Sequence, residues 1–256
     1  MTELIKEEFI SGLDSLEWMS SLTKTNARIK RYYTTIKDLT VGEYLFENTK
    51  NALTFVADET YGSLDKPVDR DQWFMGPSQV NGYYSPRQNR IVFLAAILQP
   101  PFYNPNYPKY LNYGGIGMVI GHEVTHGFDD NGNEFNFFTI FHIQIDGNQT
   151  LNENIADNGG LKLAFKAYKS LVAKEGTEGT LPGLGLTEEQ LFFIGFAQPW
   201  CSIYKKKAAL LQLQTDSHTF PKYRIFGPLH NYDKFAEAYK CKAGSPMNPA
   251  KKCTLW

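Results

Sequence analysis

The sequence predicts a mainly helical fold with one small β-sheet. His122 and His126 are four residues apart, so on a helix their side chains share one face. Apolar residues recur at helical spacing between positions 155 and 172, which predicts a second, largely buried helix. Two β-rich runs within residues 79–93, separated by a Ser-Pro-Arg-Gln turn, predict a hairpin.

Other segments extend the helical part of this prediction. Residues 2–37 and 44–53 carry amphipathic helical patterns. Thr187 and Gln190 have the spacing of a capping box, which predicts the beginning of an aromatic helix that includes residues 191–197. Pro199 follows in the continuation of that helix. Because proline removes a backbone hydrogen bond, we expect it to end or kink the helix there.

The composition limits the class of protein. The chain has 256 residues, 42% of them hydrophobic, which is enough to bury one substantial core or two small ones. A net charge of −1 gives no electrostatic reason to expect nucleic acid as a partner. The first nine residues are too charged for a signal peptide, and the longest apolar run, residues 91–98, is far shorter than the ~20 residues of a membrane-spanning helix. We therefore expect neither a signal nor a membrane anchor in this chain.

The sequence Gly-His-Glu-Val-Thr-His at positions 121–126 indicates a metal site. On a helix, His122 and His126 can both reach one metal ion, and Glu123 beside them can contact a water molecule on that ion. The alternative is a helix whose two histidines only line a solvated groove. A third protein ligand would favour the metal site, because catalytic zinc usually has three protein ligands and one open position.

Candidates for the third ligand lie at the beginning of the predicted buried helix. Glu153 and Asp157 are again four residues apart and share one helical face. One carboxylate could bind the metal while the other accepts the ring N–H of a ligating histidine. Two acids on an exposed face are the alternative, although a helix this apolar has little exposed surface.

Several motifs resemble the neprilysin and endothelin-converting enzyme family. They occur in the family's order, and they are Asn-Gly-Tyr-Tyr at 81–84, Gly-His-Glu-Val-Thr-His-Gly-Phe-Asp-Asp at 121–130, Glu-Asn-Ile-Ala-Asp-Asn-Gly-Gly at 153–160 and Met-Asn-Pro-Ala-Lys-Lys-Cys-Thr-Leu-Trp at 247–256. The resemblance implies a zinc endopeptidase with a thermolysin-like (gluzincin) catalytic domain. The family is extracellular and anchored in the plasma membrane by one helix. The resemblance covers only its carboxy-terminal half.

The resemblance also implies the parts of a catalytic metal site. One Zn²⁺ ion would be bound by His122, His126 and Glu153, with Glu123 as the general base. Asp157 would hold His122 in place, although this family position is also described as a proton donor. The ion would polarise the scissile carbonyl and lower the pKa of its water toward ~7.

The family's motifs place further residues around the substrate. His218 would stabilise the oxyanion and Asp216 would orient it, whereas a loop histidine without this match would carry no role. Arg224 would bond a backbone carbonyl of the substrate. Asn81 would bond the substrate backbone through its amide, unless it is only a local cap, and Gly82, where relatives usually have alanine, would offer its main chain.

Two features depart from the family and predict a shortened domain. Only 26 residues separate His126 from Glu153, fewer than the family places there. Within this interval residues 136–144 alternate like a strand that is apolar on both faces, and we expect His142 to be a buried histidine rather than a ligand. Cys201, Cys241 and Cys253 are an odd number, and the partners that such cysteines have in the family are absent.

These observations lead to one prediction and one alternative. We predict a single peptidase catalytic domain over residues 1–256, with a helical lead-in at 1–64 and a zinc-site core at 65–256. It would hydrolyse peptide bonds of small peptides, with peptides rather than nucleic acids as partners and no membrane-spanning segment in this chain. The alternative is a truncated family member that keeps zinc binding and lacks catalysis.

Overall fold

The computed structural model describes residues 43–62, 74–129 and 146–255, together with residues 1, 4, 64, 67, 139–140 and 143–144. The predicted helices over residues 2–37 lie outside the described residues, apart from position 4, and so does His142. The chain separates into two compact units, Lys30–Gly76 and the remainder formed by Met1–Ile29 with Pro77–Trp256. The single domain expected over residues 1–256 stays a prediction.

The smaller unit contains one described helix, α3 (Leu45–Tyr61). The helix predicted over residues 44–53 is therefore present, and it continues for two further turns. It ends where the N–H of Gly62 donates to the carbonyl of Asp58 at 2.7 Å.

The larger unit begins with the predicted hairpin. Strands β1 (Gly82–Ser85) and β2 (Arg90–Phe93) pair antiparallel, with Gly82 opposite Phe93 and Ser85 opposite Arg90. Asn89 ends the turn in the left-handed region, with φ 47°. A single 3-10 turn, η1 (Ala95–Ile97), follows, and β1 packs against helix α5.

Three consecutive elements form one helical rod: α4 (Lys109–Asn112), the π-helical turn η2 (Tyr113–Gly117) and α5 (Met118–His126). Glycines allow the rod to pass close to other backbone. A Cβ atom on Gly114 would lie 2.3 Å from the carbonyl oxygen of Phe192, and one on Gly115 would lie 2.4 Å from that of Phe102. The predicted histidine helix is therefore present as the last segment of this rod.

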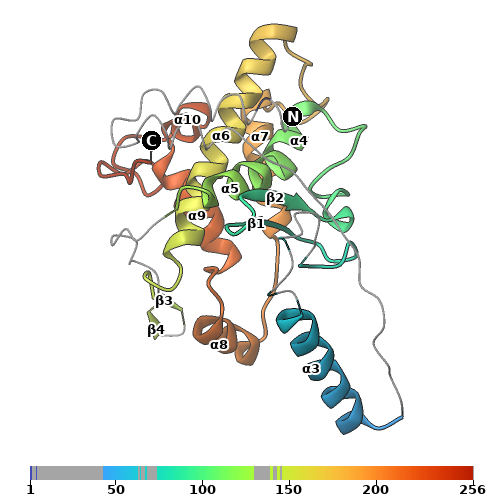
Figure 1. Ribbon diagram of the computed structural model, residues 1–256. Coiled ribbons are helices and arrows are strands. Elements are labelled where there is room, and N and C mark those ends of the chain that lie inside the picture. Colours follow the sequence, from blue (N-terminus) through green and yellow to red (C-terminus); the bar gives the residue numbers. More distant parts are fainter. Residues whose placement is uncertain are drawn as a thin grey trace. The chain divides into compact units, whose positions relative to one another are not determined.

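Helix α6 (Leu151–Glu175) lies antiparallel to the rod and beside it, as Figure 1 shows. At one end of the pair, Lys109 Nζ lies 2.5 Å from Glu175 Oε2. At the other end, His122 of α5 meets Glu153 of α6. The second predicted helix is thus confirmed, and it places both candidate carboxylates beside the histidines.

The core is formed by buried side chains of the rod, of α6 and of the helix that follows it. The predicted capping box of Thr187 and Gln190 begins α7 (Glu188–Ala197), whose aromatic residues pack against those of α6. Phe165 and Phe193 stack with ring centroids 5.2 Å apart. Helix α7 ends at Ala197 as predicted, and Pro199 sits in the following 3-10 turn η3 (Gln198–Trp200), where no helical hydrogen bond is lost.

The remaining described elements are short. Helices α8 (Lys206–Thr215), α9 (Pro221–Asn231) and α10 (Asp233–Ala238) complete the carboxy-terminal part. Strands β3 (Thr139–Ile140) and β4 (Ile143–Gln144) pair antiparallel within the stretch expected to be strand-like.

The contact between α5 and α6 depends on glycine. A Cβ atom on Gly160 would lie 2.7 Å from the backbone nitrogen of His122, and one on Gly121 would lie 2.7 Å from the carbonyl oxygen of Gly160. Backbone atoms cannot rotate away, so a methyl group here must push the helices apart. The distance between the histidines and the carboxylates therefore depends on these two positions.

We expect Gly160→Ala to lower the free energy of unfolding by about 1–3 kcal/mol, the usual cost of overpacking. Urea unfolding of the purified chain measures this. Gly227→Ala, on α9, is the control, because a Cβ atom there would meet no other atom within 4 Å. Equal stability of the Gly160→Ala variant and the unaltered chain would contradict the close-contact argument.

Candidate metal centre

The three predicted metal ligands meet between α5 and α6. Nε2 of His122 and Nε2 of His126 are 2.9 Å apart. Oε2 of Glu153 lies 3.2 Å from the first of these atoms and 3.4 Å from the second. One ligand atom from each residue lies within 4.8 Å of the other two.

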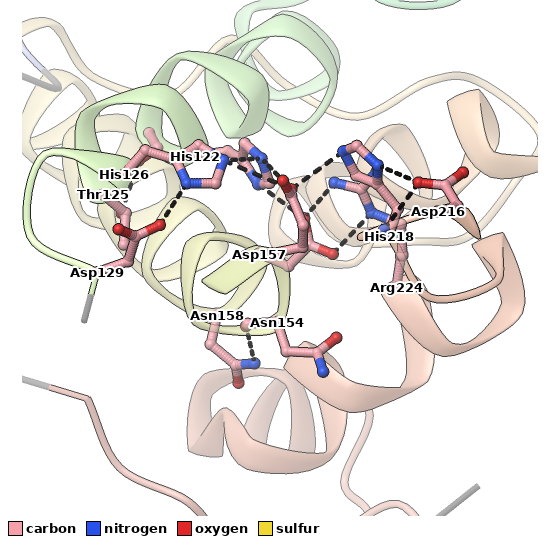
Figure 2. A network of polar contacts seen from close by, with 12 residues as sticks. His122, Thr125, His126, Asp129, Asn154, Asp157, Asn158, Asp216, His218 and Arg224 are labelled. Atoms are coloured by element: carbon pink, nitrogen blue, oxygen red, sulfur yellow. Dashed lines mark hydrogen bonds and ion pairs between the residues drawn. The ribbon is translucent and has the colours of Figure 1, made fainter. Parts of the chain in front are cut away.

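A carboxylate holds each histidine from behind. Nδ1 of His122 lies 2.8 Å from Oδ1 of Asp157, the contact expected from the sequence, as a close ion pair that is not aligned as a hydrogen bond. Nδ1 of His126 lies 2.6 Å from Oδ2 of Asp129, which the sequence analysis did not assign. Both contacts turn the Nε2 atoms toward the same point (Figure 2). An acid three residues after the second histidine, just beyond the end of the helix, is the signal that could have identified Asp129.

These residues fit a zinc ion. Oε2 of Glu153 is buried and makes no well-aligned hydrogen bond with the described residues, although three imidazole Nε2 atoms face it. A carboxylate and two imidazoles around one point form a donor set of catalytic zinc sites, in which a fourth position is left for water or substrate.

The electrostatics of the cluster favour positive charge at this point. Burial alone would raise the pKa of Glu153, but the facing imidazoles outweigh it and hold that pKa well below its ordinary value. Burial also opposes a charged His126, yet Asp129 and Glu153 beside it raise the pKa of His126 to about 10. A divalent cation bound at this point would neutralise the same carboxylates.

Glu123 is buried next to these ligands on α5. Burial raises its pKa, and the neighbouring His122 and His126 offset part of that effect. A carboxylate whose pKa is raised toward neutrality is better suited to accept and return a proton than an exposed one. The role of Glu123 as general base stays a prediction.

His218 approaches the cluster from the loop between α8 and α9. Its Nδ1 lies 2.7 Å from Oδ1 of Asp216, and its backbone N–H donates to the same oxygen at 2.9 Å. Its Nε2 lies 3.1 Å from Oε2 of Glu153. The orientation of His218 by Asp216, expected from the sequence, is thus present, and His218 faces the candidate metal position.

Arg224 on α9 makes a contact that the sequence analysis did not predict. Its Nε donates to Oδ2 of Asp157 at 2.8 Å, and its Nη2 donates to Oδ1 of the same residue at 2.7 Å. Burial would raise the pKa of Asp157, but Arg224 and His122 lower it. Asp157 is therefore held as a carboxylate between the arginine and the histidine. A bond from Arg224 to a substrate carbonyl stays a prediction.

The two residues expected to bind the substrate backbone lie at the hairpin. Asn81 immediately precedes β1, and its carbonyl accepts a hydrogen bond from the N–H of Leu94 at 3.1 Å. Gly82 begins β1, where a Cβ atom would lie 3.0 Å from Phe93 Cδ1. The structure thus joins seven of the predicted residues in one polar network and places Asn81 and Gly82 on the strand that packs against α5.

Comparison with known proteins identifies the family. The sequence profile of peptidase family M13 matches residues 81–140 and 135–255. The chain belongs to peptidase family M13. The chain is 40% identical over 305 residues to human endothelin-converting enzyme 1, covering 98% of this chain and 39% of that protein. It is also 40% identical over 304 residues to human neprilysin, covering 98% of this chain and 40% of that protein.

Solved structures agree with this assignment and with the predicted fold class. A Mycobacterium tuberculosis zinc metalloprotease, ZMP1 in complex with an inhibitor, superimposes with a TM-score of 0.84 at 30% identity, over 100% of this chain and 46% of that one. PepO from Lactobacillus rhamnosis superimposes with a TM-score of 0.78 at 26% identity, over 100% of this chain and 46% of that one. The mainly helical gluzincin fold is thereby confirmed.

The comparisons also describe how much of the relatives this chain contains. It spans about two fifths of the length of the curated relatives. The alignment of 305 positions is longer than the 256 residues of the chain, so the relative has residues within the matched region that this chain lacks. Within the described residues, no helix is both long and apolar enough to span a membrane.

We expect Asp129→Asn to weaken zinc binding by about 10–100-fold, because an amide holds the His126 ring less firmly than a carboxylate does. Competition with a chromophoric chelator measures the affinity. Asp216→Asn is the matched control, since Asp216 holds the imidazole of His218 in the same way and His218 is not a proposed ligand. Equal losses in the two variants would contradict the assignment of Asp129.

Proposed function

We propose that this chain is a zinc-dependent endopeptidase that hydrolyses small peptides with a metal-activated water. The observation that carries the proposal is the convergence of His122, His126 and Glu153 on one point, with Glu123 buried beside them. Membership of family M13 supports it, since the family's relatives include endothelin-converting enzyme 1 and neprilysin. The single three-residue group found among the described residues supports one ion per chain.

In the proposed reaction, zinc bound by His122, His126 and Glu153 supplies Lewis-acid chemistry, polarising the scissile carbonyl and lowering the pKa of water. Glu123 takes a proton from the attacking water and later delivers it to the leaving amine. Asp157 and Asp129 keep the two imidazoles in the ligating orientation. No covalent acyl-enzyme forms, because water attacks the carbonyl directly.

The remaining residues act on the substrate. His218, held by Asp216 and facing Glu153 Oε2, is placed to donate a hydrogen bond to the oxyanion that forms beside the metal position. Arg224 uses one edge of its guanidinium for Asp157 and keeps Nη1 for a substrate carbonyl. Asn81 and Gly82 align the peptide along the edge of β1.

The proposed function includes the molecules that the chain acts on and the place where it acts. Peptides are the expected partners, and the net charge of −1 offers nothing to attract nucleic acid. The resemblance to a family of membrane-anchored extracellular enzymes suggests action on the outer side of the plasma membrane. The chain would act there as the catalytic portion of such an enzyme.

A second candidate function is zinc binding without hydrolysis. It is favoured by the residues that the relative has and this chain lacks, since the two segments of the family match meet at 135–140, within the interval between His126 and Glu153. None of the three cysteines forms a disulfide. Stoichiometric zinc in the purified chain together with no cleavage of a fluorogenic peptide would favour this candidate. Cleavage would exclude it.

We expect Glu123→Gln to reduce kcat by at least about 100-fold while zinc content stays the same, because Glu123 moves the proton and does not hold the metal. Metal analysis and peptide hydrolysis are measured on the same sample. Glu237→Gln, an exposed change on α10, controls for loss of a carboxylate elsewhere. Retained hydrolysis in Glu123→Gln would show that another group is the base.

We expect His218→Ala to lower kcat by about 100–1,000-fold with little change in KM, since its hydrogen bond strengthens only as the oxyanion forms. Asn81→Ala should instead raise KM with little change in kcat, because it holds the substrate backbone throughout. Steady-state kinetics on one fluorogenic peptide separate the two effects. The same kinetic defect in both variants would contradict this division of roles.

A further inference from the structure

The guanidinium of Arg224 is held on two sides. Its edge makes two hydrogen bonds to Asp157, and its face lies over the indole of Trp200, with 4.1 Å between Cζ and the ring centroid. Oδ1 of Asp157 also lies 2.8 Å from Nδ1 of His122. A continuous series of contacts therefore joins Trp200 to a proposed metal ligand through Arg224 and Asp157.

The indole restricts rotation of the guanidinium, which the two hydrogen bonds alone do not prevent. A bidentate bond requires the guanidinium and the carboxylate to be nearly coplanar, and rotation of the guanidinium breaks one of its two hydrogen bonds. An aromatic ring on one face attracts the cation and blocks that rotation. Because Asp157 is almost completely buried, a misaligned arginine could not be replaced by water.

The backbone around Trp200 is suited to holding the indole against Arg224. Helix α7 ends at Ala197, and the turn η3 carries Trp200 as its last residue, with the N–H of Cys201 donating to the carbonyl of Gln198 at 3.2 Å. Pro199, at the second position of the turn, restricts its backbone because the ring locks φ. Trp200 itself is only partly buried. It is thus a partly buried side chain on a stiff turn, packed against the edge of the core and with one face on Arg224.

We propose that Trp200 is a positioning residue that acts through Arg224: it holds the guanidinium flat against Asp157, and Asp157 in turn holds His122 for the metal. This inference rests on the proposed metal centre. It assigns a role to the turn that contains Pro199, which the proposed reaction leaves unused. Leucine at position 200 fills space but offers no aromatic face, whereas phenylalanine keeps the face.

The test measures zinc affinity by chelator competition, which does not depend on peptidase activity. We expect Trp200→Leu to weaken zinc binding by about three- to tenfold, the range of a partly buried cation–π contact, and Trp200→Phe to recover most of the loss. Phe226→Leu is the matched control. This change removes an aromatic ring on α9 whose centroid lies 5.9 Å from Nζ of Lys222. It should leave zinc affinity unchanged.

A double-mutant cycle distinguishes positioning from a merely structural role. In an Arg224→Lys background there is no planar guanidinium to hold, so adding Trp200→Leu should change zinc affinity less than twofold. Unchanged affinity in Trp200→Leu alone, or an equal loss in the Arg224→Lys background, would overturn the inference while the proposed function stands. If the unaltered chain binds no zinc, the proposed function fails first and the inference fails with it.

Discussion

The arrangement of the candidate metal site depends on how closely α5 approaches α6. The two helices touch through backbone at Gly121 and Gly160, with no side chain between them. This contact sets the separation of His122 and His126 from Glu153 and Asp157, since all four project from the same two helices. Any residue larger than glycine there would move ligands rather than side chains. The position of the candidate metal site is therefore determined by the packing of these two helices as well as by the identity of the side chains.

Alternating charges then hold the side chains in place. Arg224 neutralises Asp157, Asp157 and Asp129 hold the imidazoles, and the imidazoles surround Glu153. Each group is buried or half-buried, so each needs its partner to offset the loss of hydration. The candidate site is consequently one cooperative network, and replacing any member is expected to disturb the others.

Local patterns in the sequence were enough to predict much of the fold and of the candidate site. The spacing of His122 and His126, the capping box at Thr187 and the turn of the hairpin each depend on residues within a few positions, and all appear as predicted. Apart from Asp129, which lies three residues from His126, the contacts that were missed join distant segments: Arg224 meets Asp157 from 67 positions away, and Trp200 meets Arg224 across a turn and a helix. No periodicity encodes such contacts, because they arise only when α9 packs against α6.

The antiparallel arrangement of the rod and α6 has one more consequence, which concerns the backbone itself. His126 is the last residue of α5, and Glu153 lies in the first turn of α6. The end of a helix carries a partial negative charge and its beginning a partial positive charge. The histidines, which must share a cation, therefore sit at a negative helix end, and the carboxylate ligand sits at a positive one. The macrodipoles of the two helices thus favour an anionic ligand on α6 and a cation beside α5, independently of any side chain.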